Sequence, residues 1–182
     1  MIFQIFNKDI LKLLTVFSIS PGSRFLRNDL KERTKLNNVN LDNAINALLN
    51  SNLIKKEKRF LYFNLDNRPI LDVVFQQYKE LKQIPLNIYF LIIDFIFFLN
   101  KSKNIDVYLF GSYSKLIFKE GSDVDLAVIS DGADKKKINN ITRKLESKYN
   151  RKLEVHYFEK NFYKNKKDPI VNEIIKNGVK LI

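Results

Sequence analysis

Two aspartates separated by one residue are the side chains of this sequence best suited to chemistry. Asp123 and Asp125 begin an apolar segment, 123–129, that is typical of a strand. Because side chains alternate along a strand, both carboxylates should lie on the same face. Neighbouring carboxylates repel each other, so a cation between them would stabilise the pair. Oxygen ligands of this kind suit Mg²⁺, which binds through one or two carboxylates together with substrate phosphates.

A glycine–serine pair precedes the aspartates and ends another apolar segment. Residues 105–110 are apolar and partly β-branched, which predicts a buried strand. Gly111 and Ser112 break this strand and open a turn or short helix, where backbone N–H groups can face an anion. The alternative interpretation is that the aspartates simply begin an ordinary exposed strand.

Together these residues resemble the nucleotidyltransferase superfamily that includes DNA polymerase β, and most closely its minimal nucleotidyltransferase branch. The family motif is a hydrophobic strand, Gly-Ser, a spacer, and then Asp-hydrophobic-Asp-hydrophobic. Gly111-Ser112 and Asp123-Val124-Asp125-Leu126 match it, and the resemblance spans residues 85–182. Many minimal members have a basic residue followed by Gly in the spacer. Here Lys115 keeps the charge but Leu116 replaces the Gly, so the local turn could differ.

The resemblance implies transfer of a nucleoside monophosphate from a nucleoside triphosphate, with ATP expected, to an acceptor hydroxyl. Asp123 and Asp125 would hold two Mg²⁺ ions. Glu154 lies in a predicted strand, 153–158, at the family's third acidic position, and would be the third metal ligand. These three carboxylates are the predicted catalytic residues. Gly111, Ser112 and Lys115 would contact the phosphates, although the Lys115 side chain could equally face outward.

The single histidine, His156, follows Glu154 by two residues and should project to the same side of the strand. Two roles remain open for it. It could act in catalysis or substrate positioning, or it could be a hydrogen-bonded residue at the edge of the pocket.

The composition limits the kind of protein that this chain can be. Its 182 residues can bury a core and form one large or two small domains, and the formal charge of +12 suggests an anionic partner such as nucleic acid or nucleotides. A genome that favours Lys, Asn and Ile codons would give the same charge. The absence of cysteine excludes a disulfide framework and fits a reducing cytoplasm. We expect no signal peptide and no membrane partner, because the most apolar stretch, 84–99, is short and contains Pro85, Asn87 and Asp94.

The N-terminal part predicts three short helices followed by a β-hairpin. Helical spacing of apolar residues predicts helices over 8–19, 25–34 and 41–49, with residues 36–40 as a turn. The hairpin covers 53–65 and has a basic tip. This order resembles the winged helix-turn-helix family of DNA-binding domains over residues 5–68.

In such domains the third helix enters the major groove and the wing contacts the DNA backbone. Asn40 and Asn43 are therefore candidates for contacts to adenine, because Asn can pair bidentately with that base. The wing cations would contact phosphates; they are Lys55, Lys56, Lys58 and Arg59. Winged helices also mediate protein contacts, so a protein partner or a homodimer remains open.

The sequence thus predicts a two-domain α+β protein. A winged helix-turn-helix domain (1–68) and a linking helix (69–84) precede a nucleotidyltransferase-type α/β domain (85–182) with a mixed sheet flanked by helices. Three interpretations of function remain open. The chain is an enzyme recruited by its winged helix, a non-catalytic DNA-binding regulator that senses nucleotide, or an antitoxin that acts on a toxin-like partner protein.

Overall fold

The computed structural model describes residues 7–79, 83–99 and 104–182. Residues 1–6 of the predicted N-terminal domain and residues 80–82 of the predicted linking helix lie outside the described ranges. The chain forms two compact units that divide between Phe90 and Leu91.

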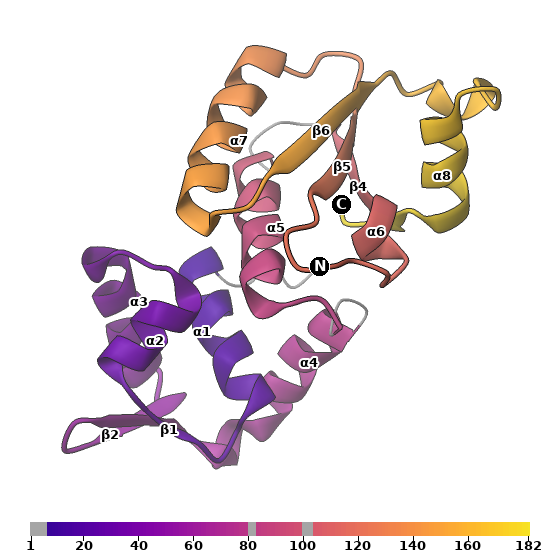
Figure 1. Ribbon diagram of the computed structural model, residues 1–182. Coiled ribbons are helices and arrows are strands. Elements are labelled where there is room, and N and C mark those ends of the chain that lie inside the picture. The colour runs from indigo at the N-terminus through magenta and orange to yellow at the C-terminus, as the bar shows by residue number, and fades with distance from the viewer. Residues whose placement is uncertain (1–6, 80–82, 100–103) are drawn as a thin grey trace. The chain divides into compact units, whose positions relative to one another are not determined.

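The N-terminal unit combines α-helices with a small sheet (Figure 1). Along the chain its elements are α1 (Lys8–Ile19), β1 (Arg24–Leu26), α2 (Arg27–Thr34), α3 (Asn38–Asn50), β2 (Ile54–Glu57), β3 (Phe60–Phe63), the 3-10 turn η2 (Leu65–Asn67) and α4 (Arg68–Lys79). The sheet is antiparallel with the order β1-β3-β2. The predicted hairpin is confirmed, with Lys58 and Arg59 at its turn.

Asparagine side chains cap the N-termini of two of these helices. The Asn7 side chain accepts a hydrogen bond of 2.8 Å from the Asp9 N–H, and Asn37 accepts one of 2.8 Å from the Asn40 N–H. Both caps satisfy a backbone donor that has no partner within the helix. The cap at Asn37 makes α3 begin at Asn38, so the predicted turn over residues 36–40 is wrong in its second half.

The predicted helix over 25–34 is also wrong at its start, because Phe25 and Leu26 belong to β1. Phe25 pairs with Leu61 of β3 and packs edge-on against Phe17, with ring centroids 5.5 Å apart. The helix begins only at Arg27, where the Asp29 carboxylate accepts a hydrogen bond from the Leu26 N–H. Strand pairing and aromatic packing thus outweigh the local helical pattern.

The C-terminal unit contains the predicted mixed sheet, which has four strands among the described residues. Its elements are α5 (Leu86–Leu99, which spans the division between the units), β4 (Asp106–Phe110), α6 (Gly111–Ser114), β5 (Val124–Ile129), α7 (Lys135–Tyr149), β6 (Leu153–Phe158), η3 (Phe162–Lys164), α8 (Pro169–Asn177) and β7 (Val179–Lys180). The strand order is β6-β5-β4-β7, in which β5 and β6 are parallel and the other pairs are antiparallel.

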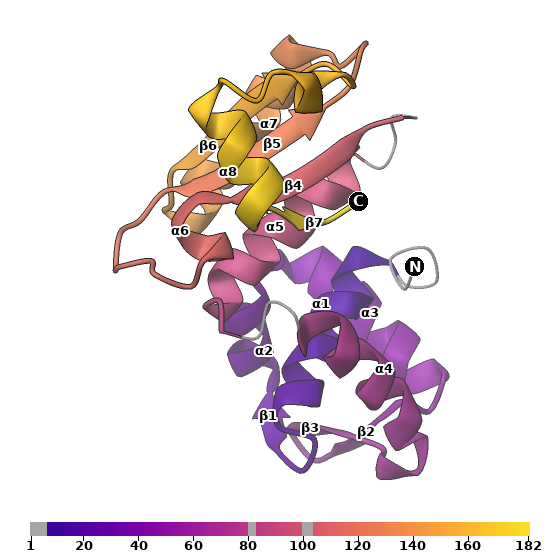
Figure 2. The ribbon, with the colours of Figure 1, turned by 90° about the vertical axis from the view of Figure 1, so that its right-hand side faces the viewer.

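Helices cover both faces of this sheet. Figures 1 and 2 show α8 on one face and α5 with α7 on the other. Ile174 of α8 packs with Phe110 and Ala127 of the sheet, which leaves α8 over the face that carries Asp125. On the opposite face the buried Asp94 carboxylate of α5 accepts hydrogen bonds from Lys148 and Tyr149 of α7, at 2.8 and 2.7 Å.

The most apolar helix, α5, is 14 residues long. Within the described ranges, no helix combines the length and the apolar character that a membrane crossing requires.

Candidate functional site

The register of three neighbouring strands brings acidic side chains together at one end of the sheet. Asp125 lies opposite Phe110 of β4 on one side and opposite Glu154 of β6 on the other. Directly opposed side chains on adjacent strands lie on the same face, which here is the α8 face. The next position along β6 on this face is His156, which lies opposite Ala127.

Asp125, Glu154 and His156 each offer a ligand atom, and these atoms all lie within 4.8 Å of one another. The His156 Nε2 is 3.4 Å from the Glu154 Oε1. Two carboxylate oxygens and an imidazole nitrogen form a donor set that fits a divalent cation. The predicted ligands Asp125 and Glu154 are therefore brought together, and His156 joins them.

Gly111 leaves the space that Asp125 occupies. The glycine has a φ of 71°, which is the left-handed region that other residues rarely adopt. A Cβ built at this position would lie 2.8 Å from the Asp125 Cγ and closer still to its Oδ2. Only glycine therefore allows both the turn after β4 and the observed position of the Asp125 carboxylate.

Asp123 lies just before β5 and is engaged by a lysine that the sequence interpretation missed. The Lys152 Nζ is 2.7 Å from the Asp123 Oδ2 and 3.5 Å from the Glu154 Oε2. Lys152 precedes Glu154 by two residues, so the alternation that placed His156 beside Glu154 could also have indicated this lysine. Among the described residues, Asp123 does not belong to the group of converging ligand atoms that contains Asp125.

The electrostatic environment disfavours the ionised form of Asp125. Partial burial raises the pKa of its carboxyl above the ordinary value, and the negative charge of Glu154 raises it further. His156 and Lys152 act in the opposite direction. A bound cation would therefore stabilise the ionised Asp125 carboxylate, because it would offset the repulsion from Glu154.

The loop between α6 and β5 is held by aromatic stacking and an ion pair. The rings of Tyr113 and Phe118 stack with centroids 4.6 Å apart. Leu116, where many minimal nucleotidyltransferases have Gly, adopts a φ of 59° in the left-handed region. The Lys115 Nζ lies 3.0 Å from the Glu173 Oε1 of α8. A phosphate could recruit Lys115 only in competition with this carboxylate.

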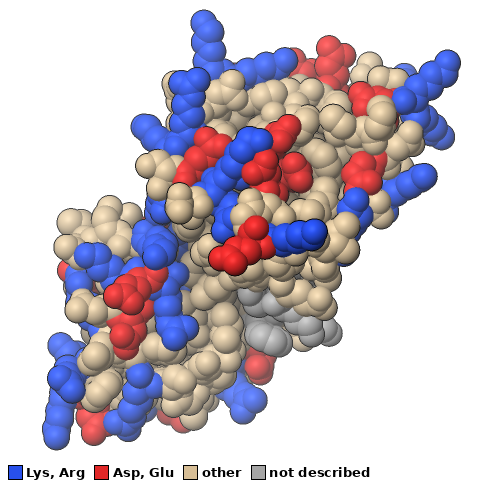
Figure 3. Space-filling view, in the orientation of Figure 1, with Lys and Arg blue, Asp and Glu red and all other residues tan. Residues whose placement is uncertain are grey.

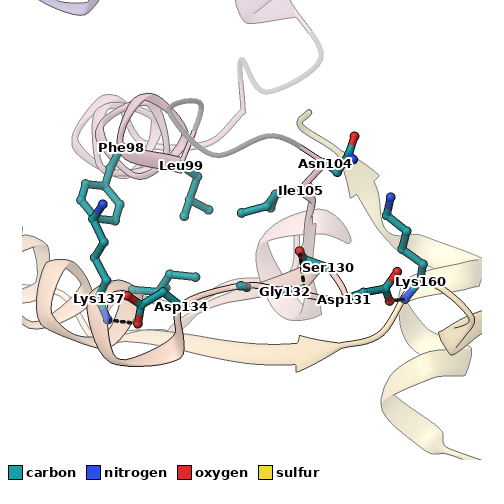
Figure 4. A pocket seen from close by; sticks show the side chains of 12 residues that line it. Phe98, Leu99, Asn104, Ile105, Ser130, Asp131, Gly132, Asp134, Lys137 and Lys160 are labelled. Atoms are coloured by element: carbon teal, nitrogen blue, oxygen red, sulfur yellow. Dashed lines mark hydrogen bonds between the residues drawn. The ribbon is translucent and has the colours of Figure 1, made fainter.

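A separate cavity of about 370 Å³ lies at the other end of the sheet. Its lining comes from the segment before β4, the end of α5, the loop after β5 and the start of α7 (Figure 4). Ser130 and Asp131 there follow the carboxyl end of β5, whereas Asp125 lies near its amino end. The cavity is thus distinct from the acidic site.

The residues predicted to contact DNA lie on α3 and the hairpin of the N-terminal unit. Asn43 and the four wing cations are exposed, and Asn40 is partly exposed. Lys55 pairs loosely with Asp66, with 3.8 Å between the charged atoms. Figure 3 shows Lys and Arg side chains intermingled with Asp and Glu on the face that it draws, so the net charge does not single out one basic patch there.

Comparison with protein families supports the resemblance seen in the Gly-Ser and Asp-Val-Asp motif. Residues 94–182 match the family model described as "Polymerase beta, Nucleotidyltransferase". This segment includes the whole sheet, the Gly111 turn and the acidic cluster, and it supports a place in the polymerase β-like nucleotidyltransferase superfamily. No curated protein and no solved structure matches the chain.

Proposed function

We propose that the C-terminal unit is a cation-dependent nucleotidyltransferase. It would transfer a nucleoside monophosphate from a nucleoside triphosphate, with ATP expected, to an acceptor hydroxyl and release pyrophosphate. The observation that carries this proposal is the close approach of Asp125 to Gly111 beside Glu154. The opposed Asp125 and Glu154 carboxylates repel each other, and a cation bound between them would relieve that repulsion.

The residues of the site would have distinct roles. Asp125 and Glu154 would hold divalent cations, and Asp123, whose carboxylate pairs with Lys152 at 2.7 Å, would be a further ligand. Bound cations would lower the pKa of the acceptor hydroxyl and neutralise the charge of the triphosphate and the leaving pyrophosphate. The turn at Gly111 and Ser112 would lie against the phosphates, and Lys115 would neutralise them after release from Glu173.

The test is incubation of the full chain with Mg²⁺ or Mn²⁺, each of the four α-labelled triphosphates, and cell extract as the source of acceptor. We expect label from one triphosphate to enter an acceptor. Asp125→Asn should reduce transfer to background, because the amide cannot replace an anionic ligand. Asp131→Asn is the matched control, since Asp131 follows the other end of β5.

Two results would contradict the proposal. Transfer by the Asp125→Asn variant at the wild-type rate would reject the assigned site. A wild-type chain that binds triphosphate but labels no acceptor would favour the non-catalytic alternative, a regulator that senses nucleotide.

We further propose that the N-terminal unit is a winged helix-turn-helix domain that binds DNA. The observation in its favour is the element order α1-β1-α2-α3-β2-β3, with the sheet order β1-β3-β2. In this arrangement α3 presents Asn40 and Asn43, and the β2–β3 hairpin carries the wing cations. A protein partner such as a toxin is the competing occupant of this surface.

DNA binding can be measured by fluorescence anisotropy of a labelled duplex at several salt concentrations. Replacing the four wing cations by Gln should weaken binding and reduce the slope of log affinity against log salt by roughly 2–4, because fewer phosphates would be neutralised. The matched control replaces four exposed cations of α7 by Gln; they are Lys135, Lys136, Lys137 and Lys144. Equal losses in both variants would show that the wing has no special role.

A further inference from the structure

The candidate metal site contains one nitrogen ligand, the imidazole of His156, beside its two carboxylates. The His156 ring projects to the same face as Asp125 and Glu154, and its Nε2 is 3.4 Å from the Glu154 Oε1. The three ligand atoms lie within 4.8 Å of one another. Ligands about 2.1 Å from one shared ion lie at most about 4.2 Å apart, so small side-chain rotations would complete the site.

The neighbours of His156 hold its ring in place beside the carboxylates. Phe110 contacts the imidazole edge-on, with ring centroids 5.3 Å apart and an angle of 69° between the planes. The residue opposite His156 on β5 is Ala127, whose small side chain leaves room for the ring on this face. The side chain is three-quarters buried, with 25% of its surface exposed.

The carboxylate that would otherwise complete an all-oxygen site is held elsewhere. Lys152 binds Asp123 at 2.7 Å, which is shorter than its 3.5 Å separation from Glu154. Asp123 therefore already has a cationic partner, whereas His156 shares the space between Asp125 and Glu154.

We propose that His156 is a direct ligand of the divalent cation held by Asp125 and Glu154, and that it makes this site prefer Mn²⁺ to Mg²⁺. Mg²⁺ favours carboxylates, phosphates and water in a strict octahedron, whereas transition-metal ions accept an imidazole nitrogen readily. The inference rests on the proposed function, because it names the ion class of that same site. It goes further in making His156 a ligand that sets the metal preference.

The experiment measures metal binding to the full chain without nucleotide. Titration with Mn²⁺ is followed by the loss of the electron paramagnetic resonance signal of the free ion, and Mg²⁺ affinity is obtained by competition in the same cell. We expect the wild-type chain to bind Mn²⁺ at least about tenfold more tightly than Mg²⁺. The His156→Ala variant should lose about tenfold or more in Mn²⁺ affinity while its Mg²⁺ affinity changes much less.

A second measurement distinguishes ligation from a structural role. His156 is the single histidine of the chain. In a protein free of purification tags, electron spin echo modulation from an imidazole nitrogen on bound Mn²⁺ must therefore come from this residue. The signal should be present in the wild type and absent in His156→Gln, whose amide would supply oxygen instead. Tyr157→Phe is the matched control, because Tyr157 lies on the same strand but on the opposite face.

The outcomes separate this inference from the proposed function. If both ions bind but His156→Ala weakens them equally, or no imidazole signal appears, His156 is not a ligand and the proposed function stands. If neither the wild type nor Asp125→Asn binds either ion, the metal site does not exist. Both the assignment of His156 as a ligand and the proposed cation-dependent function are then wrong. Retained Mn²⁺ preference in His156→Gln would also overturn the inference.

Discussion

Both units carry ion pairs on their surfaces, but the C-terminal unit also contains a pair of like-charged side chains on adjacent strands. In the N-terminal unit, opposite charges lie side by side on the surface. Arg24 lies 2.7 Å from Glu57, and Arg27 contacts Asp42 through two hydrogen bonds of 2.7 and 2.9 Å. In the C-terminal unit, strand pairing places the like-charged Asp125 and Glu154 directly opposite each other.

The exposed Arg24 and Arg27 of the N-terminal unit are already paired with opposite charges, whereas the opposed carboxylates of the C-terminal unit would be stabilised by an added cation. Exposed ion pairs are satisfied within the unit and contribute little to stability. Opposed carboxylates lower stability unless a cation lies between them. A local arrangement that costs stability is expected at a functional site, where the strain serves ligand binding. Mutations in the acidic site and in the surface ion pairs of the N-terminal unit should therefore have different effects.

The largest effect should come from Gly111→Ala, which tests whether the acidic site depends on close approach. An added Cβ would force Asp125 away and place alanine at a φ of 71°. We expect a loss of about 2–4 kcal/mol in the free energy of unfolding. Any transferase activity should fall at least about a hundredfold, because the displaced carboxylate no longer meets Glu154.

Denaturant unfolding and the labelled-triphosphate assay measure these two effects. Gly132→Ala is the control, since no atom lies within 4 Å of a Cβ at that position. Unchanged activity in Gly111→Ala would show that the Asp125 position is not required.

The second prediction concerns the stability of the unliganded protein. Asp125→Asn should raise the free energy of unfolding by up to about 1 kcal/mol at neutral pH, because it removes a like-charge pair on adjacent strands. Burial and Glu154 raise the pKa of Asp125. The ionised form is therefore destabilising in the folded state, and the wild type is relatively more stable below the ordinary carboxyl pKa.

That advantage is lost as the pH rises through the raised pKa of Asp125. The stability difference between variant and wild type should therefore be small in acid and grow toward neutral pH. Thermal melts across this range, without added metal, provide the measurement. A variant that is less stable than the wild type at every pH would show that no repulsion is present in the folded state.

A smaller effect is expected from Lys152→Met. The lysine ammonium competes with an incoming cation for Asp123 and Glu154, at 2.7 and 3.5 Å. Because an exposed ion pair contributes little free energy, its removal should raise divalent-cation affinity no more than about fivefold. Calorimetric titration with Mn²⁺ measures the change, and Lys160→Met, on a lysine that follows β6, serves as the control. Weaker binding in Lys152→Met would indicate that the lysine supports the site.

The smallest effect should come from Arg27→Gln in the N-terminal unit. Hydrogen bonding to Arg27 lowers the pKa of the Asp42 carboxyl. A lowered pKa stabilises the folded state above the ordinary carboxyl pKa, and this contribution is lost as the pH falls through the lowered value. The difference in melting temperature between wild type and variant should therefore be slight at neutral pH and vanish in acid. A large decrease in the melting temperature of Arg27→Gln at neutral pH would contradict the view that the surface ion pairs of the N-terminal unit contribute little.

Several parts of the structure followed directly from local sequence. The helical spacing predicted over residues 8–19 corresponds to α1, and Asn7 and Asp168 cap α1 and α8 with their own side chains. The alternation along β6 correctly placed Glu154 and His156 on one side. The match of the family model to residues 94–182 supports the motif-based interpretation of that segment. Such features depend on side chains a few residues apart.

Other parts could not be predicted because they depend on long-range pairing. Phe25 looked helical, yet its pairing with Leu61 in β3 makes it a strand residue. The engagement of Asp123 by Lys152 requires β6 to lie parallel to β5 in one particular register. The motif located Asp123, Asp125 and Glu154, but only the packed sheet decided that Asp125 shares its space with Glu154 and His156. The physical reason is that alternation determines the face of a side chain, whereas strand register determines its neighbours.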